Sequence, residues 1–246
     1  MTRDPGAGVV AALHRYPVKS VLGEGVDLVE VDARGVRGDR MWAVRTEDGG
    51  IGSGKNSRRF RRIDGLLRLR ATLDPTHGTD GVAHLHLPDG RVLAVDDPGA
   101  GDVLAALFGR PVELRRETTE PYHDDSPLHL VTTTSLRTLA AELGHPVEVA
   151  RFRPNVVVDT LAAGVEEGYP DDAWIGRELA LGDEVVLRVD GGMPRCVMVT
   201  AEQGELPRAP GVLTTLGRVH DVEFGVQASV VRTGVVRRGD VARLLP

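Results

Sequence analysis

The chain has 246 residues, with 41% hydrophobic and 27% charged residues, which is the composition of a globular protein that can bury a core as one large domain or two small ones. Its net charge of -6 argues against nucleic acid as a partner, and no stretch approaches the ~18 apolar residues of a membrane span. The start, MTRDPGAG, has no apolar segment after a basic one, so we expect a cytoplasmic protein without a signal peptide.

Short strands and turns are predicted over residues 9 to 116. The strand-like runs are VVAALHRYPV, GVDLVEVDA, DRMWAVRT, LLRLRATL, VAHLHLP and RVLAV. The turn signals EDGG, LDPTHGTDG and LPDG separate some of them. This close spacing favours a small barrel or sandwich. The run GDVLAALFG predicts a helix with Asp102 in its first turn and Gly109 at its end.

Two glycine-rich stretches resemble nucleotide-binding loops. From Gly49 the chain reads GGIGSGKN, which is G-x-x-x-x-G-K-[ST] except that Asn56 lacks the hydroxyl that would bind Mg²⁺. Because the neighbouring strands are short and barrel-like, EDGG instead predicts a hairpin from MWAVRT to IGSGK. In VLAVDDPGAGDVL, Leu104 replaces the third glycine of G-x-G-x-x-G, so we predict a strand-to-helix loop.

The second half begins with ETTEPYHDDSP, residues 117–127, which predicts a linker or an exposed loop. TTTSLRTLAAELG predicts a helix that Ser135 or a neighbouring Thr caps and Gly144 ends. The predicted strands after it are PNVVVD, DEVVLRVD, RCVMVT, GVQASVV and VARLL, with GVVRRGD as a turn into the last. The fold class is therefore mostly β (α+β), with a few helices.

Basic residues gather in short motifs that are far apart in the sequence. Taken singly, each Arg is most simply an exposed charge. In an acidic protein, however, several such motifs can converge on one anionic ligand, and the planar fork of Arg suits phosphate. The motifs RYPVKS, RGDR, KNSRRFRR, RFRPN and PRC supply Arg15, Lys19, Arg37, Arg40, Lys55, Arg58, Arg59, Arg61, Arg62, Arg151, Arg153 and Arg195.

The peptide RFRPN places two Arg side chains at the entrance of the buried-looking run VVVD. Pro154 predicts an extended conformation for Arg153, and sites on β scaffolds often lie at such positions. His84 and His86 would share one face of a strand, but HLHLP offers no third ligand. We therefore interpret the two histidines as part of a half-exposed strand.

The single cysteine, Cys196, excludes an internal disulfide and Cys-rich zinc or iron–sulfur sites. It is either a small buried hydrophobe or a functional thiolate. The run GGMPRCVMVT predicts a strand preceded by a Gly-Gly-Met-Pro turn, with the thiol near the strand's start. Arg195 beside it would favour the thiolate, which a soft or high-valent metal requires as ligand.

The order of six motifs resembles that of MOSC-domain proteins, a family named after the C-terminal domain of molybdenum cofactor sulfurase. The family includes the mitochondrial amidoxime-reducing component and its bacterial relatives. The motifs are YPVKS, GDRMWAV, LVTTTSL, RFRPNVVVD, PRCVMVT and GVVRRGD. The resemblance covers essentially the whole chain and implies a MOSC N-terminal β-barrel domain over residues 1–116 and a MOSC domain over residues 117–246.

The resemblance implies a molybdenum cofactor of the molybdopterin form between the two parts, with Cys196 as the metal ligand and catalytic residue. It implies reduction of N-hydroxylated small molecules by electrons from a separate flavin, haem or iron–sulfur protein. Some relatives append a ferredoxin-like domain with four cysteines, which this chain cannot hold. The implied cofactor-binding residues are Lys19, Ser20, Arg40 and Arg151 at the phosphate and ring system, Arg153, Asn155 and Arg195 nearby, and Ser53, Lys55 and Asn56 of SGKN at the rim. The alternative for SGKN is an exposed glycine-rich hairpin without a ligand.

Three departures from the amidoxime reducers leave the substrate and the exact cofactor form open. Pro194 stands where they usually carry Ser, TAEQGELPR replaces V-D-P-x-T-G, and RVHDVEFGVQA lacks a Tyr. Two alternatives also remain. One is a sulfur carrier that holds a persulfide on Cys196, and the other is a divergent MOSC fold that acts as a binding protein without metal.

Overall fold

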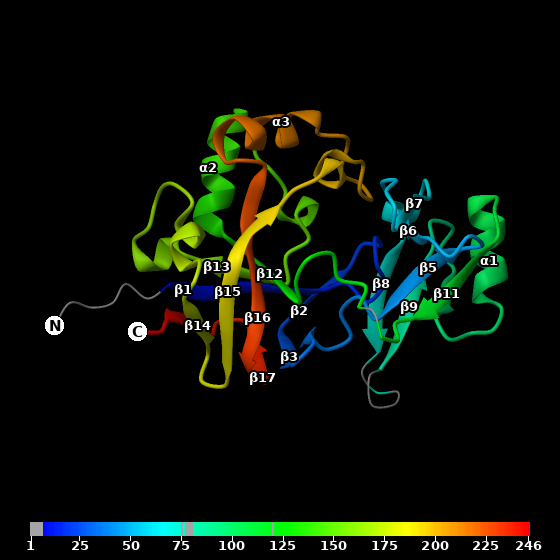
Figure 1. Ribbon diagram of the computed structural model, residues 1–246, viewed down its shortest axis with the longest axis horizontal. Helices are drawn as coiled ribbons and strands as arrows, with labels where there is room; N and C mark the ends of the chain where they lie inside the picture. Colours follow the sequence, from blue (N-terminus) through cyan, green and yellow to red (C-terminus); the bar gives the residue numbers. More distant parts are fainter. Residues whose placement is uncertain (1–6, 75, 77–80, 120) are drawn as a thin grey trace.

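The computed structural model describes residues 7–74, 76, 81–119 and 121–246, and its strands form two groups that lie side by side (Figure 1). The fold is mostly β, as predicted. Part of the predicted turn LDPTHGTDG, residues 75 and 77–80, lies outside the described residues. Within the described part of the chain, none of the helices combines the length and apolar character of a membrane span.

The larger group of strands is a closed barrel. Its strand order is β13-β12-β16-β15-β14-β18-β1, and β1 pairs with β13 to close it. The strands are β1 Gly8–Arg15, β12 Leu128–Thr132, β13 Val156–Asp159, β14 Glu178–Leu181, β15 Val185–Pro194, β16 Glu223–Arg232 and β18 Val241–Leu244. β1 comes from the N-terminal part of the chain, whereas the other strands of this barrel lie between residues 128 and 244. The domain boundary at residues 116 and 117 stays a prediction.

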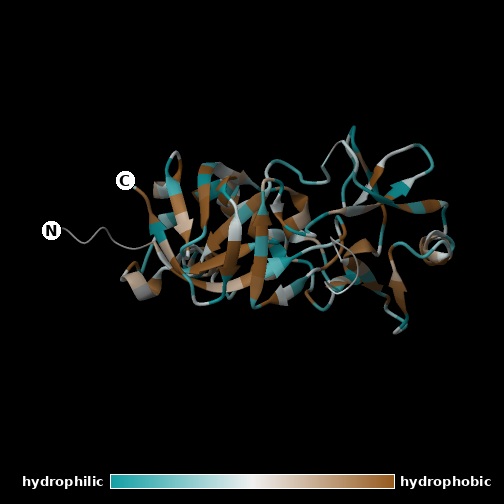
Figure 2. Ribbon diagram, turned by 90° about the horizontal axis from the view of Figure 1, so that it is seen from below, coloured by the Kyte–Doolittle hydropathy of each residue, from teal (hydrophilic) through white to brown (hydrophobic). Residues whose placement is uncertain are grey.

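Apolar side chains from the barrel strands fill its interior. Leu13, Leu130, Leu187 and Val226 are all buried in one core cluster. Figure 2 shows hydrophobic segments on the strands of both groups. Each such side chain contributes about 1.5–3 kcal/mol when fully buried. The barrel is therefore a packed scaffold, so functional groups are carried at its ends and on its connections.

The smaller group encloses a second core around Leu66, Leu69, Leu85 and Leu104. Its sheets run in the orders β11-β5-β6-β7 and β10-β9-β8, while a third small sheet, β17-β3-β4, and the short strand β2 accompany the barrel. The elements of the smaller group are β5 Trp42–Thr46, β6 Ile51–Ser53, β7 Phe60–Arg62, η1 Leu66–Arg68, β8 Arg70–Asp74, β9 Val82–His86, β10 Val92–Ala94, α1 Ala100–Phe108 and β11 Val112–Arg116. The strands that accompany the barrel are β2 Glu24–Val26, β3 Leu28–Asp32, β4 Gly35–Val36 and β17 Gly234–Arg237.

Helices cover one end of the barrel. The α-helices there are α2 Thr133–Leu143 and α3 Pro210–Val219, and the short 3₁₀ helices are η2 Val149–Arg151, η3 Leu161–Ala163, η4 Pro170–Trp174 and η5 Val197–Thr200. Thr132 caps α2 by accepting a hydrogen bond from the Ser135 amide at 3.0 Å, and Gly144 ends it at φ 76°. Phe152 and Phe224 pack between these helices and the barrel, with ring centroids 4.1 Å apart.

Several local predictions are confirmed and others are wrong, including the predicted turn GVVRRGD, whose first four residues form the strand β17. The hairpin β5–β6, the loop from β10 to α1, and the helices α1 and α2 are as expected. LLRLRATL begins as the 3₁₀ helix η1, and α3 was not predicted at all. RCVMVT was predicted as a strand, but its last four residues form the 3₁₀ helix η5. The strand β15 instead runs through the Gly-Gly-Met-Pro segment, where register shifts absorb the two glycines, and it ends at Pro194. Short apolar runs do not distinguish a strand from a helical turn.

Candidate functional site

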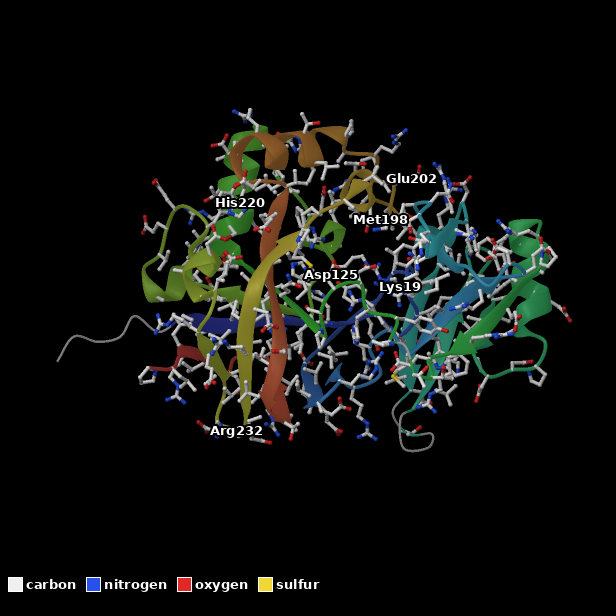
Figure 3. All side chains as sticks on the ribbon, in the orientation of Figure 1. Lys19, Asp125, Met198, Glu202, His220 and Arg232 are labelled. Atoms are coloured by element: carbon white, nitrogen blue, oxygen red, sulfur yellow. The ribbon has the colours of Figure 1, made fainter. Side chains whose placement is uncertain are left out.

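A cavity of about 450 Å³ lies between the two groups of strands. In Figure 3, the labelled residues Lys19, Asp125 and Met198 lie between the two groups. The lining includes ten of the eleven predicted site residues, namely Lys19, Ser20, Arg40, Ser53, Lys55, Arg151, Arg153, Asn155, Arg195 and Cys196. The exception is Asn56, which is exposed and whose Oδ1 accepts a hydrogen bond from the Arg62 amide at 2.8 Å.

Backbone pairing brings the first two basic motifs together. The Lys19 amide donates to the Trp42 carbonyl at 2.8 Å, and the Arg40 amide donates to the Tyr16 carbonyl at 2.7 Å. Lys19 is only 4% exposed, and its Nζ forms an ion pair with Asp124 Oδ1 at 2.8 Å. The motifs YPVKS and GDRMWAV therefore meet at one wall of the cavity.

Three non-glycine residues of the lining have left-handed backbone conformations. Ser20, Arg40 and Arg153 have φ angles of 60°, 50° and 56°. Such conformations cost about 1–3 kcal/mol each and persist only where surrounding contacts impose them. The prediction of an extended Arg153 is wrong. Pro154 disfavours the right-handed helical region for the residue before it, and the fold selects the left-handed region that remains.

The ring of Tyr16 supports two of the guanidinium groups. The Arg153 and Arg40 Cζ atoms lie 4.4 and 4.9 Å from the ring centroid. Tyr16 Oη donates to the Pro154 carbonyl at 3.2 Å. Asp39, which is fully buried, pairs with Arg40 and accepts from the Tyr16 amide at 2.7 Å. This buried aromatic and carboxylate pair fixes both Arg side chains at the cavity wall.

The cations of the lining are crowded and poorly hydrated. Burial lowers the pKa of Lys19 to about 8, although Asp124 opposes this shift. Burial, with repulsion from Arg40, lowers the pKa of Arg153 to about 10, and burial lowers the pKa of Arg195 to about 10. An anion in the cavity would relieve all three shifts, because it stabilises the charged forms.

Two buried guanidinium N–H groups also favour a negatively charged ligand. Arg153 Nη2 donates to the Val21 carbonyl and Arg195 Nη2 to the Phe152 carbonyl, both at 2.8 Å. Arg153 Nη1 and Arg195 Nε, however, are buried and have no hydrogen-bond partner among the described residues. Buried donors without a partner are costly. A bound anion would complete both.

Arg151 and Asn155 are held by protein groups. The guanidinium of Arg151, 2% exposed, donates to Glu148 Oε2 at 2.7 Å and to the Ala201 and Pro207 carbonyls at 3.3 and 2.9 Å. Arg151 therefore ties η2 to the segment after η5. The Asn155 side chain bonds the backbones of β1 and β12. Their predicted role as cofactor ligands stays a prediction.

Cys196 lies at the N-terminal cap of η5, just after β15, and is half-buried. Its Sγ is 3.6 Å from Lys55 Nζ, so Lys55 is the cation that touches the sulfur. The hairpin that carries Lys55 approaches η5 closely, because a Cβ on Gly54 would lie 2.6 Å from Met198 Sδ. The glycine that made the sequence resemble a P-loop thus brings an ammonium group to the thiol.

Several of the lining residues that sequence reasoning missed come from the predicted loop 117–127. Asp124, Asp125 and Ser126 line the cavity. Arg59 Nη2 holds this loop by donating to the Pro121 carbonyl at 2.6 Å. The polar run YHDDSP carries no periodicity that would have placed it against a buried Lys.

A strained turn holds the backbone of Arg195. Asp221 and Val222 have φ angles of 48° and 61°, and the Arg195 amide donates to the Val222 carbonyl at 2.7 Å. A left-handed conformation is unusual for a β-branched residue. Next to this turn, His220 Nε2 bonds Asp172 Oδ2 at 2.8 Å and Nδ1 bonds the Glu223 carbonyl at 2.9 Å. His220 therefore anchors the turn to η4.

Replacing His220 with Gln is expected to destabilise the fold more at low pH than at high pH. Burial lowers the pKa of His220, but its bonds to Asp172 and Glu223 raise it overall. A raised pKa contributes stability that is complete below the unfolded value of about 6.5 and is lost as pH rises through the folded value. Urea unfolding of both proteins at about pH 5.5 and pH 8.5 measures this. An equal loss at both values would contradict it.

Comparisons with known proteins agree with this geometry. A family model described as "MOSC domain" matches residues 117–243, and one described as "MOSC N-terminal beta barrel domain" matches residues 7–107. The chain is 28% identical to mitochondrial amidoxime reducing component 2 from Bos taurus, over 95% of this chain and 82% of that protein. It is 33% identical to molybdenum cofactor sulfurase from Drosophila mojavensis, over 41% of this chain and 12% of that protein.

Among solved structures, the YUAD protein from Bacillus subtilis is similar, with a TM-score of 0.53 and 15% sequence identity. The match covers 96% of this chain and 94% of that one. At this identity the likeness shows the fold alone.

Proposed function

Since the chain belongs to the MOSC-domain family, we propose that it binds a molybdenum cofactor of the molybdopterin form between its halves and reduces N-hydroxylated small molecules. The observation that carries this proposal is the position of the only cysteine in a cationic cavity of an acidic protein. The seven cationic residues of the lining are Lys19, Arg40, Lys55, Arg59, Arg151, Arg153 and Arg195. Relatives named for molybdenum cofactor sulfurase and for amidoxime reduction support a role associated with this cofactor.

The residues present fit an anionic cofactor. The unpartnered N–H groups of Arg153 and Arg195 would donate to its oxygens, and Lys19 and Arg40 would carry the phosphate charge. The carboxylates of Asp124 and Asp125 leave the lining with a net positive charge, since seven cations face two carboxylates. A cavity of about 450 Å³ is within the range of cofactor sites.

Cys196 would supply the protein's sulfur ligand. Thiolates suit soft and high-valent metals, and Lys55 places a positive charge 3.6 Å from the sulfur. When bound, the cofactor would supply two-electron chemistry in which an N–OH group, two electrons and two protons give an N–H group and water. The chain itself cannot hold a Cys-ligated electron relay, so the electrons would come from a separate flavin, haem or iron–sulfur protein.

Metal and pterin analysis of the purified protein tests this proposal. The protein should be produced in cells with an intact cofactor pathway, and about one molybdenum and one pterin per chain are expected if Cys196 supplies the ligand. The loaded protein should reduce benzamidoxime to benzamidine with a chemical electron donor. A folded protein that takes up no molybdenum under these conditions would overturn the proposal and leave a binding protein without metal.

A second candidate is a sulfur carrier, which the half-buried, cavity-facing thiol and the relatives named molybdenum cofactor sulfurase favour. Here Cys196 would accept a sulfur atom from the persulfide of a cysteine desulfurase, whose own thiol is the leaving group. Mass spectrometry after incubation with such an enzyme and free cysteine decides between the two. A gain of one sulfur on Cys196 without molybdenum would support the carrier, whereas no gain would exclude it.

Replacing Lys55 with Ala is expected to weaken cofactor affinity by about tenfold, because one charge-assisted contact is lost. Lys55→Arg should retain most of the affinity. The matched control is Arg58→Ala, which removes the same charge from an exposed position of the same hairpin. Cofactor exchange followed by molybdenum analysis gives the affinities. Equal affinity for Lys55→Ala and wild type would make the hairpin a scaffold only.

A further inference from the structure

A second cavity, of about 730 Å³, lies where η1 and the end of α1 face η5. Much of its lining is apolar and includes Leu67, Phe108 and the core residue Ile63. Two further apolar side chains of the lining remain open to solvent, since Leu107 is 40% and Val197 is 51% exposed. Covering such surface is favourable by about 25 cal/mol per Å². The cavity therefore offers a hydrophobic surface to a ligand.

A thin wall separates this cavity from the first one, around Lys19 and Cys196, which is called the cofactor cavity below. Ser53, Lys55 and Cys196 line the cofactor cavity, whereas Gly54 and Val197 line the second one. Residues of both segments thus contribute to the two spaces. A Cβ on Gly54 would lie 2.6 Å from Met198 Sδ, so a larger residue there would have to displace the Met198 side chain. The second cavity is a separate space.

Contacts between the two halves of the molecule hold the second cavity open. The Gly204 amide donates to the Leu67 carbonyl at 2.8 Å, and Arg68 Nη2 pairs with Glu202 Oε1 at 2.9 Å. The first contact is a backbone hydrogen bond, and the second is an ion pair at the rim of the cavity. The cavity is therefore built into the junction between η1 and the segment after η5, which makes it a preformed site.

The rim carries one uncompensated positive charge. Arg62 pairs with Asp64 at 2.7 Å, and Arg68 pairs with Glu202. Arg208 also lines the cavity, and it has no ion-pair or hydrogen-bond partner in the part of the chain that the structure describes. Three guanidinium groups thus face two carboxylates. A guanidinium without a partner next to apolar surface suits a single carboxylate or sulfonate group.

We propose that the second cavity binds a small amphipathic monoanion, with its acid group on Arg208 and its apolar body over Leu107 and Val197. A monocarboxylate with a hydrocarbon chain or an aromatic ring has this chemistry. The ligand would contact η5, the helix that Cys196 caps. This inference does not depend on molybdenum, so its failure and that of the proposed function are separate results.

Two fluorescent probes that differ by one sulfonate test the site on the full chain. They are 8-anilinonaphthalene-1-sulfonate and the neutral N-phenyl-1-naphthylamine. The anionic probe is expected to bind saturably and to be displaced by octanoate. Arg208→Gln should weaken the anionic probe by about tenfold and leave the neutral probe unchanged, while Leu107→Asp should weaken both by about tenfold.

The control and the competitor locate the bound probe. Val92→Asp introduces the same charge at a residue that is 52% exposed on β10 and outside both cavities, so it should change neither affinity. Pyrophosphate would occupy the cationic cofactor cavity and should leave the anionic probe in place. Displacement by pyrophosphate, insensitivity to both cavity variants, or no saturable binding would each overturn the proposal.

Discussion

Replacing Cys196 with Ala is expected to reduce molybdenum in the purified protein to background and the reduction of N-hydroxylated substrates by about 10³-fold or more. The sequence offers no second thiol that could replace it. Among the described residues, no group of three or more His, Cys, Asp or Glu side chains is arranged to hold a metal. The expected loss therefore follows from the proposal that the sulfur of Cys196 is the protein's ligand to the metal.

Cys196→Ser separates the chemistry of sulfur from packing. The hydroxyl has nearly the same shape but is a poor ligand for a soft metal, so this variant should lose molybdenum as the Ala variant does. Val231→Ala, at a residue that is 54% exposed on β16, should keep it. Thermal unfolding of the four proteins shows that each is folded. Full molybdenum in either Cys196 variant would exclude the thiolate as the ligand.

Most of the cavity lining could be predicted because six short motifs resemble those of the MOSC-domain family, and their cationic residues suit an anionic ligand. A single Cys beside Arg and a Lys in a glycine-rich hairpin are unusual enough to notice without any knowledge of the fold. What the motifs did not predict is which N–H groups are free. Arg151 looks equal to Arg153 in RFRPN, yet Arg151 is bonded to three protein oxygens, whereas Arg153 retains an unpartnered nitrogen. Such partners are set by tertiary contacts.

The errors in secondary structure have a common origin. VMVT after Cys196 has the composition of a strand, but no neighbouring strand pairs with it after β15 ends at Pro194, so it closes a 3₁₀ turn instead. In α3, the run PGVLTTLGRV includes two Gly and two Thr residues, which weaken a helix prediction. The helix forms because Val212 and Leu216 are buried against the barrel end. Local propensity was overridden by packing in both cases.

Replacing Asp39 with Ala is expected to lower the free energy of unfolding by about 3–5 kcal/mol, because it leaves an uncompensated charge on Arg40, whose side chain is only 14% exposed. Asp39 is 0% exposed. Its Oδ2 pairs with Arg40, and its Oδ1 accepts from the Tyr16 amide at 2.7 Å. The substitution removes both contacts at once. Urea unfolding followed by the fluorescence of Trp42 and Trp174 measures the change.

Two further variants assign this loss to its cause. Asp39→Asn keeps an acceptor for the Tyr16 amide but not the charge, so its loss should lie between those of wild type and Asp39→Ala. Asp32→Ala removes a carboxylate that bonds the Arg34 amide at 2.7 Å on the exposed surface, and it should cost less than about 1 kcal/mol. If Asp39→Ala cost no more than this control, the Asp39–Arg40 pair would not stabilise the cavity wall.

Because Arg40 and Arg153 share the ring of Tyr16, loss of their counter-charge should also loosen both guanidinium groups. Cofactor affinity in Asp39→Asn is then expected to fall, although Asp39 does not line the cavity.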